Sequence, residues 1–334
     1  MQGQDSENRP RATALPSEAA FAVVGDPEPT SMSARTAMLL VAAALIFSTG
    51  ALFVREVDHP HPWTSVFWRS IFASASLALL IVLRERSNAL RAVERVGMPG
   101  LKVGAAFSAA SIALVVALAH ASSAVVLVIF ALGPLAAALM AWAMLGERVH
   151  NYTWVAIGAT VGGVVFMVSG SGANASILGV AIAFVMPISV GFGTVIIRKH
   201  STIAMLPAML LGAVISALVA APFAHPLQVT RHDLGVLGLF GFAQLAVGLA
   251  IFSFAAPRAP VADVALISIL EPIMGPIWVW IFVSEYPGMS ALVGGSVVFV
   301  ALAAHTIYPR LEVSRVGLRS SRPGDAAHFE LVDE

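Results

Sequence analysis

The chain has 334 residues, of which 58% are hydrophobic and only 11% are charged, and its mean hydropathy is +0.86. Soluble domains carry about 25% charged residues, so this chain cannot cover a water-facing surface of its own size. The composition therefore excludes a soluble enzyme, a nucleic-acid-binding protein and a disordered protein. Basic and acidic side chains both number 19, so no excess charge points to a polyanionic partner. The absence of cysteine excludes disulfides and thiolate metal sites.

The hydrophobic residues fall in runs that are long enough to cross a bilayer, which takes about 20 predominantly apolar residues per helix. The runs lack strict alternation, which argues against an outer-membrane barrel. The sequence therefore predicts an all-α integral membrane protein with ten transmembrane helices in the lipid bilayer. The expected spans are residues 36–54, 63–83, 101–119, 122–145, 152–169, 177–197, 203–223, 234–256, 264–283 and 288–308.

The two ends of the chain are polar. Residues 1–34 combine acidic residues with Pro, Ser and Ala and have no apolar core of the signal-peptide type. Residues 309–334 carry four arginines near the last span. We expect a disordered cytoplasmic tail at the N-terminus and a similar cytoplasmic tail at the C-terminus.

The positions of Lys and Arg predict the orientation in the membrane, because cytoplasmic loops carry an excess of positive charge. If the N-terminus is cytoplasmic, sixteen of the 19 Lys and Arg residues lie on the cytoplasmic side. Only Arg55 and Arg231 lie outside, and Arg69 lies within a span. This bias predicts a multi-pass protein of the cytoplasmic (inner) membrane with both termini in the cytoplasm.

The spans divide into two halves of nearly equal length, residues 36–169 and 177–308. At an offset of 138 residues, the fourth and ninth spans share seven identical residues in 24 positions. Since each half has five spans, an odd number, the halves enter the membrane from opposite sides and form inverted repeats. This arrangement is common in secondary transporters. The aligned pairs include Pro134 and Pro272, Trp142 and Trp280, and Glu147 and Glu285.

These residues also carry a family resemblance. Leu132-Gly133-Pro134 followed by Leu145-Gly146-Glu147 resembles the end of an EamA domain of the drug/metabolite transporter superfamily, as does Leu270-Glu271-Pro272 followed by Ser284-Glu285. The segment 256–260 resembles the short basic connector of this family, and Phe67-Trp68-Arg69 resembles its aromatic-arginine pattern. The resemblance covers about residues 36–308, and one departure from it is Ser284, where the first half has Gly146. It implies two EamA-like repeats, a ten-helix carrier with a central cavity, and no ATP hydrolysis.

Two ionisable residues, Arg69 and Glu271, lie well inside the expected spans. A charge at this depth costs roughly 2.5–3.5 kcal/mol on insertion scales and usually faces a cavity or a partner. Glu271 shares a helical face with Ser268 and Trp278. This face predicts a site for a substrate amine or a proton, and the alternative is a carboxyl group that caps frayed backbone or pairs with a neighbouring helix. We expect helix breaks at Pro134, Pro272 and Pro276, because proline removes a backbone hydrogen bond.

Arg69 belongs to a second polar stripe with Ser65, Phe72 and Ser76. Three interpretations stay open for Arg69: a clamp for a substrate carboxylate, an ion partner for Glu271, or a side chain that extends to the membrane surface. If Arg69 and Glu271 face one cavity, an amino acid or a similar amphipathic metabolite would satisfy both charges. A nucleotide fits less well, because one cation cannot meet several negative charges.

The sequence therefore predicts a secondary transporter that moves a small organic metabolite by alternating access, with export favoured by the family resemblance. A channel-like pore and a membrane receptor without transport activity are the alternatives. Common enzyme motifs are missing, and we expect no enzymatic activity, cofactor, metal site or nucleic-acid partner. Small-residue pairs at Gly158 and Gly162, and at Ser290 and Gly294, indicate close helix packing within the chain or in a homodimer.

Overall fold

The computed structural model describes residues 32–58, 61–147, 149–170, 176–200 and 205–320, and all regular elements in these ranges are helical. This confirms the expected all-α class. Short 3-10 turns η2 and η5 and a π-helix η4 join the α-helices. The elements are α1 (Ala34–Ser48), α2 (Gly50–Glu56), α3 (Pro62–Glu85), η2 (Arg86–Asn88), α4 (Ala89–Glu94), α5 (Gly97–Leu118), α6 (Ser123–Phe130), α7 (Gly133–Leu145), α8 (Asn151–Gly170), α9 (Ile177–Lys199), α10 (Met205–Ala220), α11 (Arg231–Leu239), η4 (Phe240–Val247), α12 (Gly248–Ala255), η5 (Ala256–Arg258), α13 (Val261–Ser268), α14 (Leu270–Val283) and α15 (Met289–Ser320).

Nine helical segments within the described ranges are long and apolar enough to cross a membrane, so the chain is a multi-pass membrane protein. They correspond to nine of the ten expected spans. Within the expected span 203–223 the structure describes α10, an apolar helix of 16 residues from Met205 to Ala220, and residues 203–204 of this span lie outside the described residues. Nine helices, and not ten, therefore meet the length of a membrane span in this part of the chain.

The ends of the chain differ from the expected tails in one respect. Helix α15 continues to Ser320, so residues 309–320 are helical and not an irregular tail. The other expected tail residues, 1–31 and 321–334, lie outside the described residues.

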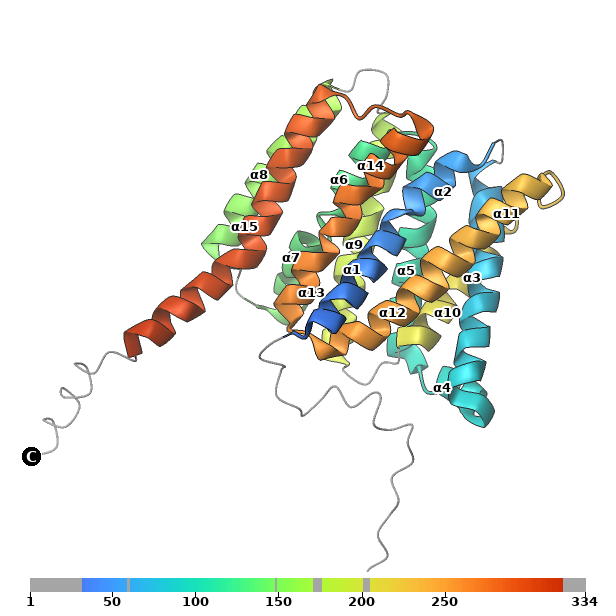
Figure 1. The fold of residues 1–334 in the computed structure, drawn as a ribbon, viewed down its shortest axis with the longest axis horizontal. Coiled ribbons are helices and arrows are strands. Elements are labelled where there is room, and N and C mark those ends of the chain that lie inside the picture. Colours follow the sequence, from blue (N-terminus) through green and yellow to red (C-terminus); the bar gives the residue numbers. More distant parts are fainter. Residues whose placement is uncertain (1–31, 59–60, 148, 171–175, 201–204, 321–334) are drawn as a thin grey trace, which may run out of the picture.

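Helices α8 and α15 lie side by side at one edge of the bundle (Figure 1). Their contact is close because Gly163 faces Gly294: a Cβ on Gly163 would come within 2.8 Å of the Gly294 carbonyl oxygen. The expected pair Gly158 and Gly162 does not make this contact, since nothing lies within 4 Å of a Cβ at either position. The close packing uses the neighbouring face of α8.

The remaining helices make matching contacts in the two halves of the chain. Helix α1 packs on α12, α13 and α14, and helix α9, at the same place in the second half, packs on α5, α6 and α7. Helix α3 packs on α10 and η4, and α10 packs on α3 and α5. Each half therefore places its first helix against the third and fourth segments of the other half, and its second helix against the second and third.

The fourth and ninth expected spans are each broken in the middle. Helix α6 ends at Phe130 before α7, and α13 ends at Ser268 before α14. Proline lacks an N–H group, and its ring clashes with the carbonyl four residues earlier. Four residues before Pro134 and Pro272 stand Phe130 and Ser268, where the two helices end. Pro276 differs, because it lies inside α14 and the helix continues through it.

Candidate functional site

Arg69 and Glu271 line one cavity of about 210 Å³ in the middle of the bundle. Its other polar side chains are Ser48, Ser111 and Gln244, and most of the remaining lining is apolar. The cavity lies where both halves of the chain meet, since α1, α3, α5 and α6 contribute from the first half and η4 and α14 from the second. The apolar lining includes Phe47, Phe107, Leu114, Leu127, Phe130, Met186, Leu245 and Leu249.

Contacts hold one part of the Arg69 guanidinium group, and its Nε has no hydrogen-bond partner among the described residues. Its Nη1 donates a hydrogen bond of 2.5 Å to Ser111 Oγ, and its guanidinium lies 4.2 Å above the ring of Phe240. The side chain is only 3% exposed, yet its Nε has no hydrogen-bond partner among the described residues. Gly241 allows η4 to lie this close to α3, because a Cβ at Gly241 would lie 2.6 Å from the Arg69 carbonyl oxygen. Arg69 therefore does not extend to the membrane surface.

Glu271 is the second residue of α14, directly after the break at Ile269. A helix N-terminus carries a partial positive charge, which favours a carboxylate in the first turn. Among the described residues, Glu271 has no hydrogen bond or ion pair. In particular, it does not pair with Arg69, although both side chains face the same cavity. The two opposite charges thus line one cavity without forming an ion pair.

Gln244 is a polar residue of this cavity that sequence reasoning missed. It lies in the π-helix η4, and its Nε2 donates a hydrogen bond of 3.1 Å to the Phe47 carbonyl oxygen. Its Oε1 is buried and has no partner in the described structure. One sequence signal was available: Gln244 is the only Asn or Gln within the ten expected spans.

A second, larger cavity of about 620 Å³ adjoins the first and shares Phe130, Val190 and Glu271 with it. Its lining also includes Ser268, Pro134 and Pro272 from the helix breaks. At its mouth lie Glu147 and Arg198, whose side chains are 44% and 55% exposed and form an ion pair of 2.9 Å. We call this side of the bundle the Arg198 end, and the cavity opens there.

Other residues of the predicted site do not line either cavity. Trp278 Nε1 donates a hydrogen bond of 2.8 Å to Ser48 Oγ. Its indole therefore contacts a residue of the smaller cavity without lining the cavity itself. Phe72 packs against Trp68, and Ser65 is buried in α3. Pro276 lies within α14. Of the predicted binding residues, Arg69 and Glu271 line the smaller cavity, and Glu271 and Ser268 line the larger one.

At the opposite side of the bundle, which we call the Arg55 end, a network of hydrogen bonds and an ion pair surrounds Glu285. Arg55 Nε lies 2.7 Å from Glu285 Oε2, and both side chains are only 24% exposed. Arg55 also donates hydrogen bonds to the carbonyl oxygens of Leu118 and Ala121. Ser123 donates to Glu285 Oε1 through its N–H and its hydroxyl group. This network ties the ends of α2, α5, α6 and α14 together.

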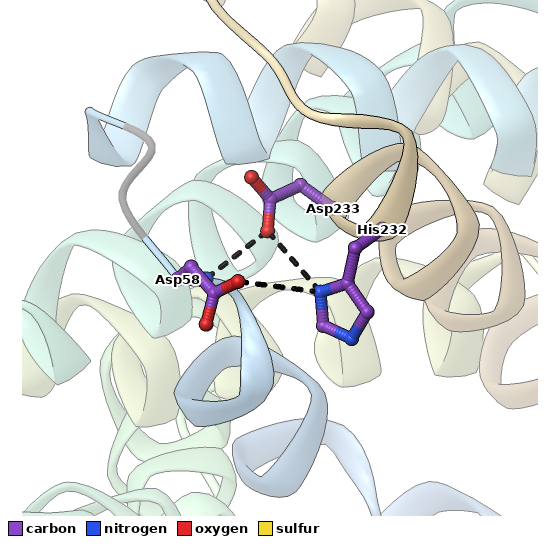
Figure 2. Close-up of side chains that lie close together, drawn as sticks. All are labelled: Asp58, His232 and Asp233. Atoms are coloured by element: carbon purple, nitrogen blue, oxygen red, sulfur yellow. Dashed lines mark hydrogen bonds and ion pairs between the residues drawn. The ribbon is translucent and has the colours of Figure 1, made fainter.

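A smaller cluster joins the start of α11 to the loop after α2 at the same end (Figure 2). Asp233 Oδ1 accepts a hydrogen bond of 3.0 Å from the Asp58 N–H, and His232 Nδ1 lies 3.6 and 3.7 Å from the two carboxylates. The three side chains each offer a ligand atom within 4.8 Å of the others. Zinc takes four ligands in structural sites, and Asp233 is already engaged by the backbone. The cluster therefore fastens the start of α11 to the loop after α2.

Comparison with known proteins gives a family match and a fold match. The model of the EamA-like transporter family matches residues 34–169. A solved structure titled "Crystal structure of protein" aligns with a TM-score of 0.55 and 18% identity, over 82% of this chain and 98% of that chain. At this identity, the similarity shows the fold alone. No curated protein sequence matches at the significance level applied.

Proposed function

We propose that the chain is a secondary carrier for a small zwitterion. Residues 34–169 match the model of the EamA-like transporter family, which supports a membrane transporter of the drug/metabolite transporter superfamily. The substrate class is an amino acid or a similar amphipathic metabolite. One observation carries this proposal: Arg69 and Glu271 line the same cavity and form no ion pair with each other among the described residues.

The cavity suits such a substrate in charge and size. The free Nε of Arg69 is a donor for a carboxylate, and a guanidinium binds carboxylates well. Glu271 is an acceptor for an ammonium group, and the aromatic and aliphatic lining suits an apolar side chain. Drug-sized ligands occupy sites of about 300–1,000 Å³, and this cavity is smaller. A loaded site would compensate both protein charges, which lowers the cost of closing it off from water.

We also propose that the two halves are inverted repeats of five helices each, with α10 as the seventh span. The matching contacts of α1 and α9 support this arrangement, as does the helix break before Pro134 in one half and before Pro272 in the other. Transporters of this kind place the substrate near the midplane between the repeats and use broken helices there. The cavity of Arg69 and Glu271 supports this placement, because residues of both halves and of the broken helices line it.

The proposed mechanism is alternating access between the two ends of the bundle. In this structure the larger cavity leads from Glu271 to the Arg198 end, while the Arg55 network covers the other end. The distribution of Lys and Arg favours the Arg198 end as the cytoplasmic side. The structure then corresponds to an inward-open state in the cytoplasmic membrane, with the family resemblance favouring export.

Single cysteines test this orientation without background, since the chain has none. Leu90 in α4, at the Arg198 end, and Leu227, in the loop before α11, are 80% and 98% exposed. In intact cells, an impermeant thiol reagent should label Leu227→Cys and leave Leu90→Cys unlabelled. The reverse pattern would contradict the proposed orientation.

A channel-like pore is the main alternative, and the difference between the two ends argues against it. A pore would need a continuous path, whereas the described Arg55 end is fastened by a network of hydrogen bonds and an ion pair. A receptor without transport activity would not need two opposite charges that line a central cavity without forming an ion pair.

Substrate counterflow in liposomes tests the proposed substrate class. Liposomes that contain the purified protein are loaded with L-leucine. Uptake of radiolabelled L-leucine is then measured in the presence of two competitors of the same shape. Isoamylamine lacks the carboxylate, and 4-methylpentanoate lacks the ammonium group. L-Leucine should compete at least about tenfold better than either, since each charged hydrogen bond has this effect. Equal competition by all three compounds would contradict the proposal. So would uptake that is the same with and without L-leucine inside the liposomes.

A further inference from the structure

The amide nitrogen of Gln244 donates a hydrogen bond, whereas the amide oxygen has no partner among the described residues. The Phe47 carbonyl oxygen can only accept a hydrogen bond, so the Gln244 nitrogen must face it. This fixes the orientation of the amide and leaves Oε1 as the free atom. The side chain is 6% exposed, and its Oε1 has no partner among the described residues. A buried acceptor without a partner costs free energy, and this one belongs to a residue that lines the substrate cavity.

The local backbone at Gln244 also departs from a regular helix. Residues 240–247 form a π-helix between α11 and α12. Such segments are rare and occur frequently at functional sites. Gly50 of α2 leaves room for the amide, because a Cβ at Gly50 would lie 3.1 Å from Gln244 Nε2. The amide is therefore positioned by the fold at the cavity wall.

The contacts of the Gln244 amide place it closer to the level of Arg69 than to that of Glu271. Counted from the Arg55 end at about 1.5 Å per residue, Arg69 lies roughly 10 Å along α3 and Glu271 roughly 18 Å from Val283. By the same rise from Glu56, Gly50 and Phe47, which contact the amide, lie roughly 9 Å and 14 Å deep. In a zwitterion whose carboxylate binds Arg69, the ammonium group would lie between Arg69 and Glu271, where Gln244 lines the cavity.

We propose that Gln244 Oε1 is the second acceptor for the substrate's ammonium group, beside Glu271, and that it selects substrates with at least two N–H donors. This inference rests on the proposed function, because it assigns a role within the same site. A carboxylate alone attracts any cation, including a fully methylated one. An amide oxygen adds a directional hydrogen bond, which a quaternary ammonium group cannot donate. The site then distinguishes amino acids from their betaines.

A methylation series measures this selectivity. L-Leucine, N-methyl-leucine, N,N-dimethyl-leucine and leucine betaine carry three, two, one and no N–H donors. Their inhibition of radiolabelled L-leucine counterflow is measured in the wild type and in Gln244→Met, which has a similar length and no amide oxygen. In the wild type, the betaine should bind about 10- to 100-fold more weakly than L-leucine. In Gln244→Met, affinity for L-leucine should fall and affinity for the betaine should stay, so that the preference largely disappears.

A second variant separates this role from a structural one. Gln244→Glu retains an acceptor oxygen but loses the donor to the Phe47 carbonyl. If the acceptor matters, Gln244→Glu should restore the preference for L-leucine over the betaine. If the amide only fastens α1 to η4, Gln244→Glu should behave like Gln244→Met. A purely steric rejection of methyl groups would persist in Gln244→Met.

The outcomes separate a failure of the proposed function from a failure of the role proposed for Gln244. Absence of both L-leucine counterflow and an L-leucine-induced rise in melting temperature in the wild type would contradict the proposed function. L-Leucine transport with equal affinity for the betaine in the wild type would overturn the role of Gln244. So would an unchanged preference in Gln244→Met. The wild-type series gives this answer even where a variant fails to fold.

Discussion

The two ends of the bundle use the same pair of side chains in different surroundings. At the Arg55 end, an arginine from the first span of one half meets Glu285, which follows the fourth span of the other half. At the Arg198 end, an arginine from the first helix of the second half meets Glu147, which follows the fourth span of the first half. The first pair is largely covered and the second is half exposed.

The surroundings determine how strongly each pair holds its end together. Arg55 and Glu285 have further hydrogen bonds to two carbonyl oxygens and to Ser123, and hydrogen bonds to charged groups contribute about 1.5–3 kcal/mol each. An exposed pair such as Arg198 with Glu147 contributes about 0.2–1 kcal/mol. Under the proposed alternating access, this difference keeps the Arg55 end closed while the Arg198 end is open.

The largest expected effect comes from the site that both ends would serve. Exchanging its charges, in the double variant Arg69→Glu with Glu271→Arg, should reduce L-leucine counterflow at least about 100-fold, because the zwitterion would have to bind in reverse. The melting temperature of the purified variant serves as the folding control. Retained flux with unchanged substrate preference would mean that the two charges only shape the bundle.

Weakening the closed end should have the next largest effect. Glu285→Gln removes the ion pair and leaves Arg55 with its carbonyl partners. The Arg55 end should then open more often, by about 10- to 100-fold. The measurement is the labelling rate of a cysteine at Ala110, which lines the smaller cavity, with reagent added from that side. An unchanged rate would show that the network does not close this end.

The matched change at the other end should be weaker. Glu147→Gln removes an exposed pair, so labelling of the same cysteine should change less than about fivefold. Comparison of Glu285→Gln with Glu147→Gln is thus a direct measure of the difference between the ends. Equal effects of the two variants would contradict the argument from burial.

The smallest effect is expected for the cluster of Asp58, His232 and Asp233. Asp58→Asn removes an exposed carboxylate but retains the backbone N–H that binds Asp233. Labelling from the Arg55 side should rise about twofold or less. A larger rise would make this cluster, and not Glu285, the main closure of that end.

The sequence predicted the features that follow from local chemistry. Arg69 and Glu271 stand out because charges inside apolar runs are costly. The helix ends at Phe130 and Ser268 follow from proline geometry, since each lies four residues before Pro134 or Pro272. Pro276 differs because α14 continues through it.

Positions that depend on packing between distant segments were harder to predict. Trp278 shares a helical face with Glu271, but it lies about two turns further along α14, roughly 10 Å by helix rise. It therefore reaches Ser48 on α1 and not the cavity. Gly163, and not Gly162, faces α15, because the rotation of α8 is set by its neighbour. Gln244 carried a sequence signal, but its free oxygen depends on the position of Phe47 in the other half.

Two-sided labelling of the cavity tests the central claim of alternating access most directly. A cysteine at Ala110 is exposed to an impermeant reagent from either face of sealed membranes, with and without an L-leucine gradient. We predict rapid reaction from the Arg198 side without substrate, and reaction from the Arg55 side only while L-leucine is being transported. Equal reaction from both sides, independent of L-leucine, would indicate a pore and contradict the account.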